Sequence, residues 1–138
     1  MNRRAFVFAS LAASVANPLV IGTAHATGSL APSGLQVIYI GGKDCPPCRR
    51  WIATYKDSWL ASPEYREVTW VEVEPPHLKE AYRERHWPED LRPVLAQVPH
   101  KSGTPRFLIV ENGRIVSNQV GVSKWLRTMA ELKKLLGE

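Results

Sequence analysis

Two cysteines three positions apart are the residues of this chain with the clearest chemical potential. Cys45 and Cys48 flank Pro46 and Pro47, and they are the only cysteines among 138 residues. A thiolate at this spacing can attack a disulfide, and its neighbour can then release the product from the mixed disulfide. So few cysteines exclude a scaffold that depends on several disulfides. We therefore predict that the pair acts as one redox unit.

The place of the pair in the chain supports this interpretation. The apolar run Leu35 to Ile40 is typical of a buried strand and ends shortly before Cys45. A helix is expected from Pro46 to about Ala61, because apolar side chains recur at helical spacing at Cys48, Trp51, Ile52, Tyr55 and Trp59. A reactive cysteine at a helix N-terminus has its pKa lowered to roughly 3.5 to 7.5, from about 8.5. Cys45 is therefore the expected attacking thiolate, with Cys48 one turn further on.

Two other roles for the cysteine pair stay open on these grounds. A structural disulfide is possible in principle, but a loop of two residues removes little chain entropy, so its stabilising effect would be weak. A close cysteine pair also supplies half of a tetrahedral metal site. The chain has no second cysteine pair, and His77, His86 and His100 lack a compact ligand spacing. We predict no metal and, without a glycine-rich nucleotide motif, no cofactor besides the redox-active disulfide.

The remaining strands predict an α/β domain over residues 35–138. Glu67 to Glu74 alternates, with Val68 and Trp70 facing one side and Val71 and Val73 the other. Two further strands, Arg106 to Glu111 and Arg114 to Val120, are expected to form an antiparallel hairpin because Asn112-Gly113 is a strong two-residue turn signal.

The helices are expected between and after these strands. His77 to Trp87 contains strong helix formers and predicts a largely solvated helix, while Leu91 to Pro99 is either a short helix or a loop. Ser123 is the expected cap of a last helix with apolar positions at Trp125, Leu126, Met129, Leu132 and Leu136. The predicted order is β-α-β-α-β-β-α.

The N-terminal segment predicts export. Residues 1–26 join a basic start to an apolar stretch and end on the small-x-small pattern Ala24 to Ala26, which signal peptidase prefers. Arg3 and Arg4 resemble the start of a twin-arginine signal, and the general secretory route is the alternative. Residues 27–34 are expected to be a flexible tether. The oxidising periplasm is the expected compartment, where a cysteine pair can form a disulfide.

Charge and composition exclude several classes of protein. After residues 1–26 the chain has 16 basic and 13 acidic side chains, and no basic run is interleaved with aromatic residues. Nucleic-acid binding is therefore not expected. Hydrophobic residues at 44% and charged residues at 22% are ordinary values for a globular protein. We expect one folded domain that is a monomer.

Several motifs, in their order along the chain, resemble the thioredoxin family. They are CPPC at 45–48, Gly103-Thr104-Pro105, the hairpin sequence RFLIVENGRIV, and Gly121 before the last helix. The resemblance covers nearly all of residues 35–136. It implies a thioredoxin-like fold, with a central four-stranded mixed sheet flanked by helices, and the family's thiol:disulfide oxidoreductase activity.

The resemblance also implies roles for individual residues. Cys45 is the nucleophile and Cys48 the resolving thiol, and the Thr104–Pro105 bond is a cis peptide that lies against the cysteines. The backbone of Thr104 would pair with an extended segment of the substrate. Pro46, Pro47, Thr104 and Pro105 are the expected substrate-binding residues.

Three departures from the family pattern stand out. Asp44 occupies the position where a tryptophan often precedes the first cysteine, and Tyr39 occupies the place of a buried acid. Proton transfer to Cys48 is then expected to use water or Glu72. The stretch from 75 to 102 is longer than a minimal thioredoxin needs, so it is expected to influence partner choice. Tyr82 and Trp87, within it, are expected to pack in the interior.

The two prolines predict the direction of the reaction. Neither Pro46 nor Pro47 has an N–H group, so the Cys45 thiolate loses two backbone donors and is stabilised less. This places the expected reduction potential nearer about −270 mV than about −120 mV, which favours a reductant. The chain also resembles exported CPPC thioredoxins that serve cytochrome c maturation or sulfur oxidation, and this resemblance implies exported proteins of those pathways as substrates. Because the chain has no cofactor motif, a membrane-bound electron donor is expected. The alternatives are a disulfide oxidase or isomerase, and a binding module without redox turnover.

Overall fold

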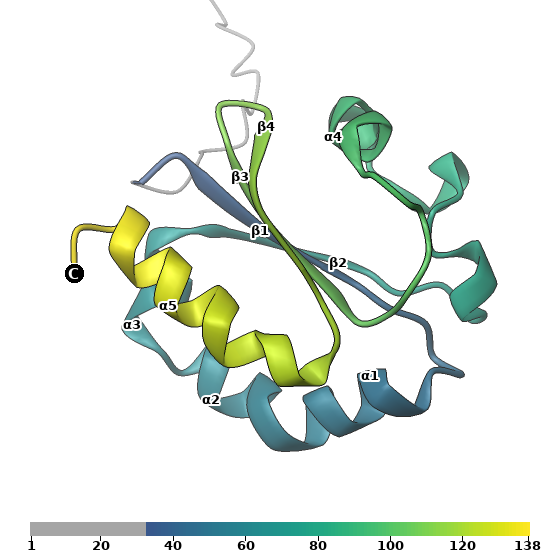
Figure 1. Cartoon of the computed structure of the whole chain (residues 1–138), viewed down its shortest axis with the longest axis horizontal. Helices are drawn as coiled ribbons and strands as arrows, with labels where there is room; N and C mark the ends of the chain where they lie inside the picture. The colour runs from purple at the N-terminus through teal and green to yellow at the C-terminus, as the bar shows by residue number, and fades with distance from the viewer. Residues whose placement is uncertain (1–32) are drawn as a thin grey trace, which may run out of the picture.

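The computed structural model describes residues 33–138, and within them a four-stranded sheet forms the centre of the molecule (Figure 1). Its strands are ordered β2-β1-β3-β4. Strand β1 is parallel to β2 and antiparallel to β3, and β3 is antiparallel to β4. The bounds are β1 Leu35–Ile40, β2 Thr69–Val73, β3 Arg106–Glu111 and β4 Arg114–Val120. The expected mixed sheet of four strands is therefore confirmed.

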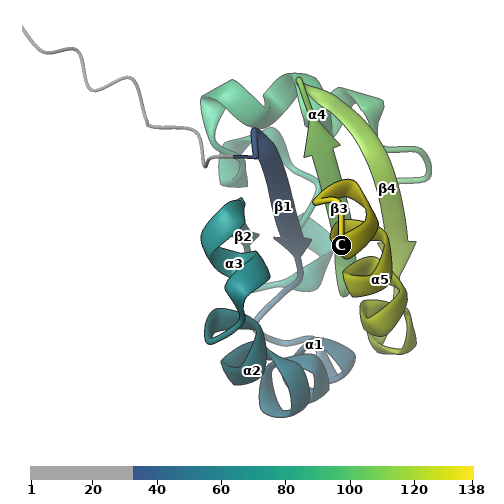
Figure 2. The same cartoon turned by 90° about the vertical axis from the view of Figure 1, so that its left-hand side faces the viewer.

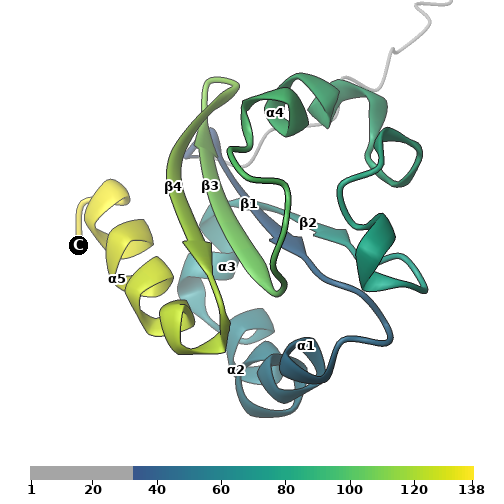
Figure 3. The same ribbon diagram turned by 45° about the vertical axis from the view of Figure 1, so that its right-hand side comes forward.

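Helices cover both faces of this sheet (Figures 1 and 3). One face carries α1, α2, α3 and α5, and the other carries α4 together with several short 3₁₀ turns. The bounds are α1 Pro46–Trp51, α2 Asp57–Leu60, α3 Pro63–Glu67, α4 Arg92–Gln97 and α5 Trp125–Leu135. Among residues 33–138, no helix is long and apolar enough to cross a membrane. The expected signal segment 1–26 and most of the expected tether lie outside the described residues.

The first helix follows the predicted pattern closely. A π-helical segment, Ile52–Lys56, joins α1 to α2, so the chain stays helical from Pro46 to Leu60. Trp51 and Trp59 are buried, and Ile52 and Tyr55 are partly buried beside them. These four side chains therefore pack in the core on the side of the sheet that the helix covers, as the spacing predicts.

Helix α3 was not expected, and it shortens the predicted second strand. Glu67 belongs to α3, and β2 begins at Thr69. Ser62 caps α3 because its hydroxyl accepts the Tyr65 N–H at 3.2 Å, and Pro63 takes the first turn. Ser33, at the end of the expected tether, donates from its hydroxyl to the Glu67 carbonyl.

The predicted helix from His77 to Trp87 is wrong. The chain forms two 3₁₀ turns there, Leu78–Glu80 and Glu84–His86, separated by the extended Arg83. Helix propensity is a weak preference, and long-range hydrogen bonds of this segment override it. The helix between β2 and β3 is α4 instead, which settles the open choice for 91–99. Pro93 is accommodated in its first turn, where a missing N–H does no harm.

The last helix differs from its prediction at two positions. Ser123 lies in a 3₁₀ turn, Val122–Lys124, and Lys124 is the residue that precedes α5, without a side-chain cap. Leu126 is 64% exposed, so it does not belong to the buried face. Trp125 and Leu132 are buried as expected, and Met129 and Leu136 pack beside them.

The sheet separates two cores of different composition. The aromatic layer, under α1, α2 and α5, contains both cysteines and the buried rings of Tyr39, Trp51, Trp59, Phe107 and Trp125. The aliphatic layer, under α4 and the 3₁₀ turns, is built from Ile38, Ile40, Val73, Leu91, Val94, Leu95, Leu108 and Val110, with Trp87 as its large aromatic member. The predicted alternation of the second strand is confirmed, because Val68 and Trp70 face the first layer and Val71 and Val73 the second.

Candidate active site

The cysteine pair lies at the start of α1, where the chain leaves the end of β1. Cys45 and Cys48 form a disulfide, with their Cα atoms 5.2 Å apart. Cys45 is the N-cap residue of α1, and its Sγ accepts the Cys48 N–H at 3.2 Å. Both cysteines are buried. The electrostatic preference of a helix N-terminus for negative charge therefore acts at Cys45.

The prolines between the cysteines differ in exposure. Pro46 is exposed and Pro47 is half-buried, and both lie in the first turn of the helix. Because neither has an N–H group, the Cys48 amide is the first backbone donor after Cys45 that can reach its sulfur. Arg49 directs its guanidinium to the Lys43 carbonyl at 3.2 Å.

A second segment, from the start of β3, lies against the disulfide. The Thr104–Pro105 peptide bond is cis, as the resemblance implies. The Thr104 Oγ1 lies 3.2 Å from the Cys45 Sγ, and Pro105 is buried. The Pro105 carbonyl accepts the Gly121 N–H at 2.8 Å, which joins this loop to the end of β4. The structure thus places Thr104 against the Cys45–Cys48 disulfide, as the resemblance implies, while the substrate-binding roles expected of Thr104 and Pro105 stay predictions.

The group behind the cysteines is Tyr39, which contributes no carboxylate. Its ring stacks on Trp51 with centroids 4.8 Å apart, and its hydroxyl donates to Glu74 at 2.9 Å. Burial, with the neighbouring Glu74, raises the pKa of Tyr39 far above its ordinary value, so the ring stays neutral. Glu72, which together with water was an expected route for the Cys48 proton, pairs with Lys56 at 2.7 Å. Within residues 33–138, the structure records no contact of Glu72 with Cys48.

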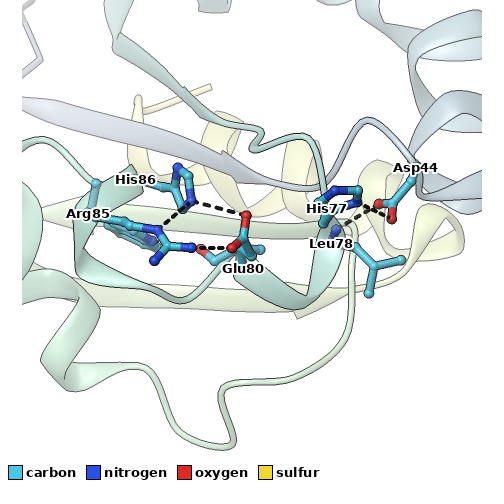
Figure 4. Close-up of polar contacts among 8 residues, drawn as sticks. Asp44, His77, Leu78, Glu80, Arg85 and His86 are labelled. Carbon is cyan, nitrogen blue, oxygen red and sulfur yellow. Dashed lines mark hydrogen bonds and ion pairs between the residues drawn. The ribbon is translucent and has the colours of Figure 1, made fainter.

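Asp44, directly before the nucleophile, ties a distant segment to the site (Figure 4). Its carboxylate accepts the Leu78 N–H at 2.7 Å and lies 3.3 Å from the His77 Nδ1. The Leu78 hydrogen bond is the main cause of the lowered pKa of Asp44. Gly42 is required here, because a β-carbon at that position would lie 2.5 Å from the Leu78 Cα.

A second attachment joins the same segment to the cis-proline loop. The Tyr82 hydroxyl donates to the Gly103 carbonyl at 2.5 Å. Beneath the Tyr82 ring lies Arg106, whose guanidinium carbon is 5.2 Å from the ring centroid. Tyr82 is half-buried and Trp87 is buried, as expected for packing roles. Sequence reasoning noted Asp44 only as a departure and missed Arg106 and Leu78, because each acts through a partner far away in the chain.

The described residues offer no alternative chemistry of the metal-binding kind. No group of three or more His, Cys, Asp or Glu side chains in residues 33–138 is arranged to hold a metal ion. Of the three histidines, His77 and His100 are exposed and His86 is half-buried. The arrangement around the cysteines is suited to thiol–disulfide exchange, in which the protein's own sulfurs carry the electrons.

Comparisons with known proteins agree with this architecture. No protein-family model and no curated protein sequence matches the chain. Among solved structures, the periplasmic thioredoxin SoxS from Paracoccus pantotrophus, in its reduced form, is similar with a TM-score of 0.54 and 18% identity, covering 75% of this chain and 96% of that one. A thioredoxin from Malassezia sympodialis has a TM-score of 0.50 and 16% identity, covering 76% and 77%. At these identities the likeness shows the fold, which is thioredoxin-like.

Proposed function

We propose that the protein is an exported thiol:disulfide oxidoreductase that reduces disulfides in partner proteins. One observation carries the proposal: Cys45, at the N-terminus of α1, is joined to Cys48 and lies against the Thr104 hydroxyl of the cis-proline loop. The cis-proline loop beside the sulfur is the proposed docking place for an extended polypeptide, which a purely structural disulfide would not need. The thioredoxin-like fold supports the same conclusion.

The proposed reaction starts from the dithiol form. The Cys45 thiolate attacks one sulfur of the partner's disulfide, which forms a mixed disulfide and releases the other partner sulfur as a thiolate that takes up a proton. Cys48 then loses its proton, and its sulfur attacks the Cys45 sulfur. This step breaks the mixed disulfide and releases the second partner thiol. Two electrons have passed to the partner, and the protein is left as the Cys45–Cys48 disulfide.

The residues of the site support a role for each group in this sequence. The Cys48 N–H donates to the Cys45 sulfur and stabilises its thiolate. Tyr39 stays neutral beneath the pair, so the proton of Cys48 leaves through water rather than through a buried carboxylate. Thr104 offers its backbone to an extended partner segment, next to Pro46 and Pro47 on the outer side of the loop.

The direction of the reaction and the compartment belong to the same proposal. The two prolines leave few amide donors for the thiolate, which favours the disulfide form of the protein and hence a reductant. The basic and apolar start of the chain, with its small-x-small end at 24–26, supports export. The similar SoxS is itself a periplasmic thioredoxin. Exported proteins of cytochrome c maturation or sulfur oxidation are the proposed substrates, with a membrane-bound electron donor that restores the dithiol.

The test is reduction of insulin disulfides by the reduced mature protein. We expect turnover by the unmodified chain and none by Cys45→Ser, while Cys48→Ala should stop at the mixed disulfide and hold partners covalently. Serine keeps the size of the side chain, so the loss reports on the sulfur. Activity that persists in Cys45→Ser would contradict the assignment of the nucleophile.

Two further outcomes separate the alternatives. Equilibration with glutathione should give a reduction potential of about −270 mV, and a value above about −150 mV would instead favour a disulfide oxidase or isomerase. A wild-type protein without any turnover would favour a binding module whose cysteines are structural. Capture of a cytochrome or a sulfur-carrier protein by Cys48→Ala would identify the pathway.

A further inference from the structure

A basic hollow lies on the surface of the 75–102 segment, beside the active site. It is lined by Lys79, Tyr82, Arg83 and Lys101. A second hollow shares Lys79 and Arg83 and continues to Glu80 and Arg85. The two form one surface, which we call the basic hollow, with Lys79 and Arg83 at its centre.

The positive charge of the basic hollow is not neutralised from within. Its one acidic residue, Glu80, is already engaged by Arg85 and by the His86 Nε2, 3.5 Å away (Figure 4). Across residues 33–138, no ion pair is recorded for Lys79, Arg83 or Lys101. The Lys101 ammonium donates to the Val98 carbonyl at 3.1 Å, which holds it in place but leaves its charge. Three cations therefore share this surface without a counter-ion.

A buried cation beneath the hollow adds to this field. Arg106 is 4% exposed and lies under the Tyr82 ring. Its guanidinium donates to three carbonyls of the adjoining loop, those of Pro99, His100 and Ser102, at 3.0 to 3.2 Å. No carboxylate pairs with it in the described part of the chain, and its Nε has no acceptor. A charge away from water is screened less, so it raises the potential of the surface above it.

Two contacts hold the basic hollow next to the reacting sulfur. Tyr82, in its wall, donates to the Gly103 carbonyl, and Gly103 is followed by the Thr104 that touches Cys45. Lys79 follows Leu78, whose N–H is held by Asp44 beside Cys45. A polypeptide whose disulfide reaches Cys45 and whose backbone pairs with the cis-proline loop would therefore run toward the hollow.

We propose that the basic hollow binds a carboxylate-rich segment of the partner polypeptide, adjacent to the disulfide that is reduced. The proposal rests on the proposed function and names a property of its substrates. Charge complementarity carries it: three unpaired surface cations above one buried cation form a site for Asp and Glu side chains. A polypeptide is favoured over an anionic membrane surface because the hollow continues the cis-proline loop, where a polypeptide must lie.

The test compares two synthetic peptides that contain the same single disulfide, one flanked by Asp and Glu and the other by Asn and Gln. With the reduced mature protein at low salt, we expect kcat/KM for the acidic peptide to exceed that for the amide peptide by about tenfold. Added salt should bring the ratio toward one, because exposed charges are screened. The triple variant K79Q/R83Q/K101Q should lose most of the preference even at low salt.

The control variant is R114Q/K134Q, which removes two exposed cations outside the hollow. Arg114 begins β4 at the hairpin, at the opposite end of the sheet from α1 (Figure 2), and Lys134 is near the end of α5. It should keep the preference for the acidic peptide. Equal kcat/KM values for the two peptides in the wild type, or a preference retained by the triple variant, would overturn the proposal. So would co-sedimentation with phosphatidylglycerol vesicles that the triple variant loses while the peptide ratio stays unchanged.

A binding measurement separates this proposal from the proposed function. A linear acidic peptide without cysteines, labelled with a fluorophore, should bind to the oxidised protein and bind more weakly to K79Q/R83Q/K101Q. If neither disulfide peptide is reduced but the linear peptide binds in this way, the proposed oxidoreductase activity is refuted and the proposed binding role of the basic hollow is retained. If both disulfide peptides are reduced but the linear peptide does not bind in this way, the proposed binding role of the basic hollow is refuted and the oxidoreductase activity is retained.

Discussion

The two faces of the sheet are built in different ways and serve the site differently. The aromatic layer is covered by regular helices and encloses both cysteines. The aliphatic layer is covered by one short helix and a series of 3₁₀ turns, and the loops on its outer side carry the basic hollow. The aromatic layer therefore determines the environment of the two sulfurs. The loops outside the aliphatic layer carry the surface that we propose selects the partner polypeptide.

The charges follow the same division. Behind the cysteines, burial and the neighbouring Glu74 keep Tyr39 neutral, and the rings of Trp51, Trp70 and Phe107 pack around its ring. On the other face, Arg106 is buried with its charge intact. In a neutral environment, the helix N-terminus is the main source of stabilisation for the Cys45 thiolate. The buried charge of Arg106 instead raises the electrostatic potential of the surface above it.

The largest expected effect comes from removing one large buried ring from each face of the sheet and comparing the loss of stability and the change in redox potential. Trp51→Ala removes a fully buried ring that stacks on Tyr39 at 4.8 Å, and it should cost about 3–5 kcal/mol. Trp87→Ala removes a ring whose Nε1 donates to the Ala81 carbonyl at 2.8 Å, and it should cost about 3 kcal/mol because the surrounding turns can relax. Urea unfolding measures both losses.

The redox potential distinguishes the two variants further. Trp51→Ala should shift the potential of the cysteine pair, since the ring shares the aromatic layer with both cysteines. Trp87→Ala should leave the potential unchanged and reduce the preference for the acidic peptide, because the segment that carries the basic hollow loses its anchor. The conservative controls are Trp51→Phe and Trp87→Phe. Equal shifts of the potential in both alanine variants would show that the faces are not independent.

A pair of adjacent glycines allows a finer comparison of the same faces. A β-carbon at Gly41 would overlap the Tyr39 hydroxyl, in the aromatic layer, whereas one at Gly42 would meet the backbone of Leu78 in the other segment. Each alanine substitution should cost about 1–3 kcal/mol through overpacking. Only Gly42→Ala should push the segment away and accelerate hydrogen exchange of the Leu78 amide. Accelerated exchange at Leu78 in Gly41→Ala as well would mean that the two contacts are coupled.

The sequence predicted one face far better than the other. The apolar stripe of the first helix, the proline at its first turn and the Asn112-Gly113 hairpin are local signals, and the structure agrees with each. The signal for α3 was also local, since Ser62 precedes Pro63 in an ordinary cap, and it was overlooked. The candidate site could be predicted as far as the two cysteines and the cis-proline loop.

The conformation of the 75–102 segment could not be predicted from local signals in the sequence, for a physical reason. Its helix-forming residues are held in 3₁₀ turns by bonds that span the chain, from Leu78 to Asp44 and from Tyr82 to Gly103. Nothing in the spacing of these residues indicates such partners. Arg106 gave no signal either, because a charged residue at the start of an apolar strand is ordinarily placed in solvent. The basic hollow therefore became visible only in the structure.

The smallest expected effects concern two carboxylates whose pKa values are both lowered, one between helices of the aromatic layer and one that holds the 75–102 segment. Glu64 is buried and held ionised by its own backbone N–H and by Lys133 at 3.3 Å, a contact between α3 and α5. Asp44 is held ionised chiefly by the Leu78 N–H. Each native pKa lies below the unfolded value, about 4.3 for Glu and 3.9 for Asp, so each contribution is present above that value and lost as the pH falls through the native pKa.

The two losses should be measured by different observables. Glu64 joins two helices of the aromatic layer, so its protonation should lower the free energy of global unfolding, by about 0.2–1 kcal/mol, and Glu64→Gln should remove this part of the acid dependence. Asp44 is exposed and fastens one segment, so its protonation should release the Leu78 amide to hydrogen exchange without a change in global unfolding. Asp44→Asn should show that release at neutral pH. If acid instead destabilised the whole molecule through Asp44, the attachment of Leu78 to Asp44 would unfold together with the cooperative core, and partner contact at the basic hollow would act directly on the environment of the sulfurs.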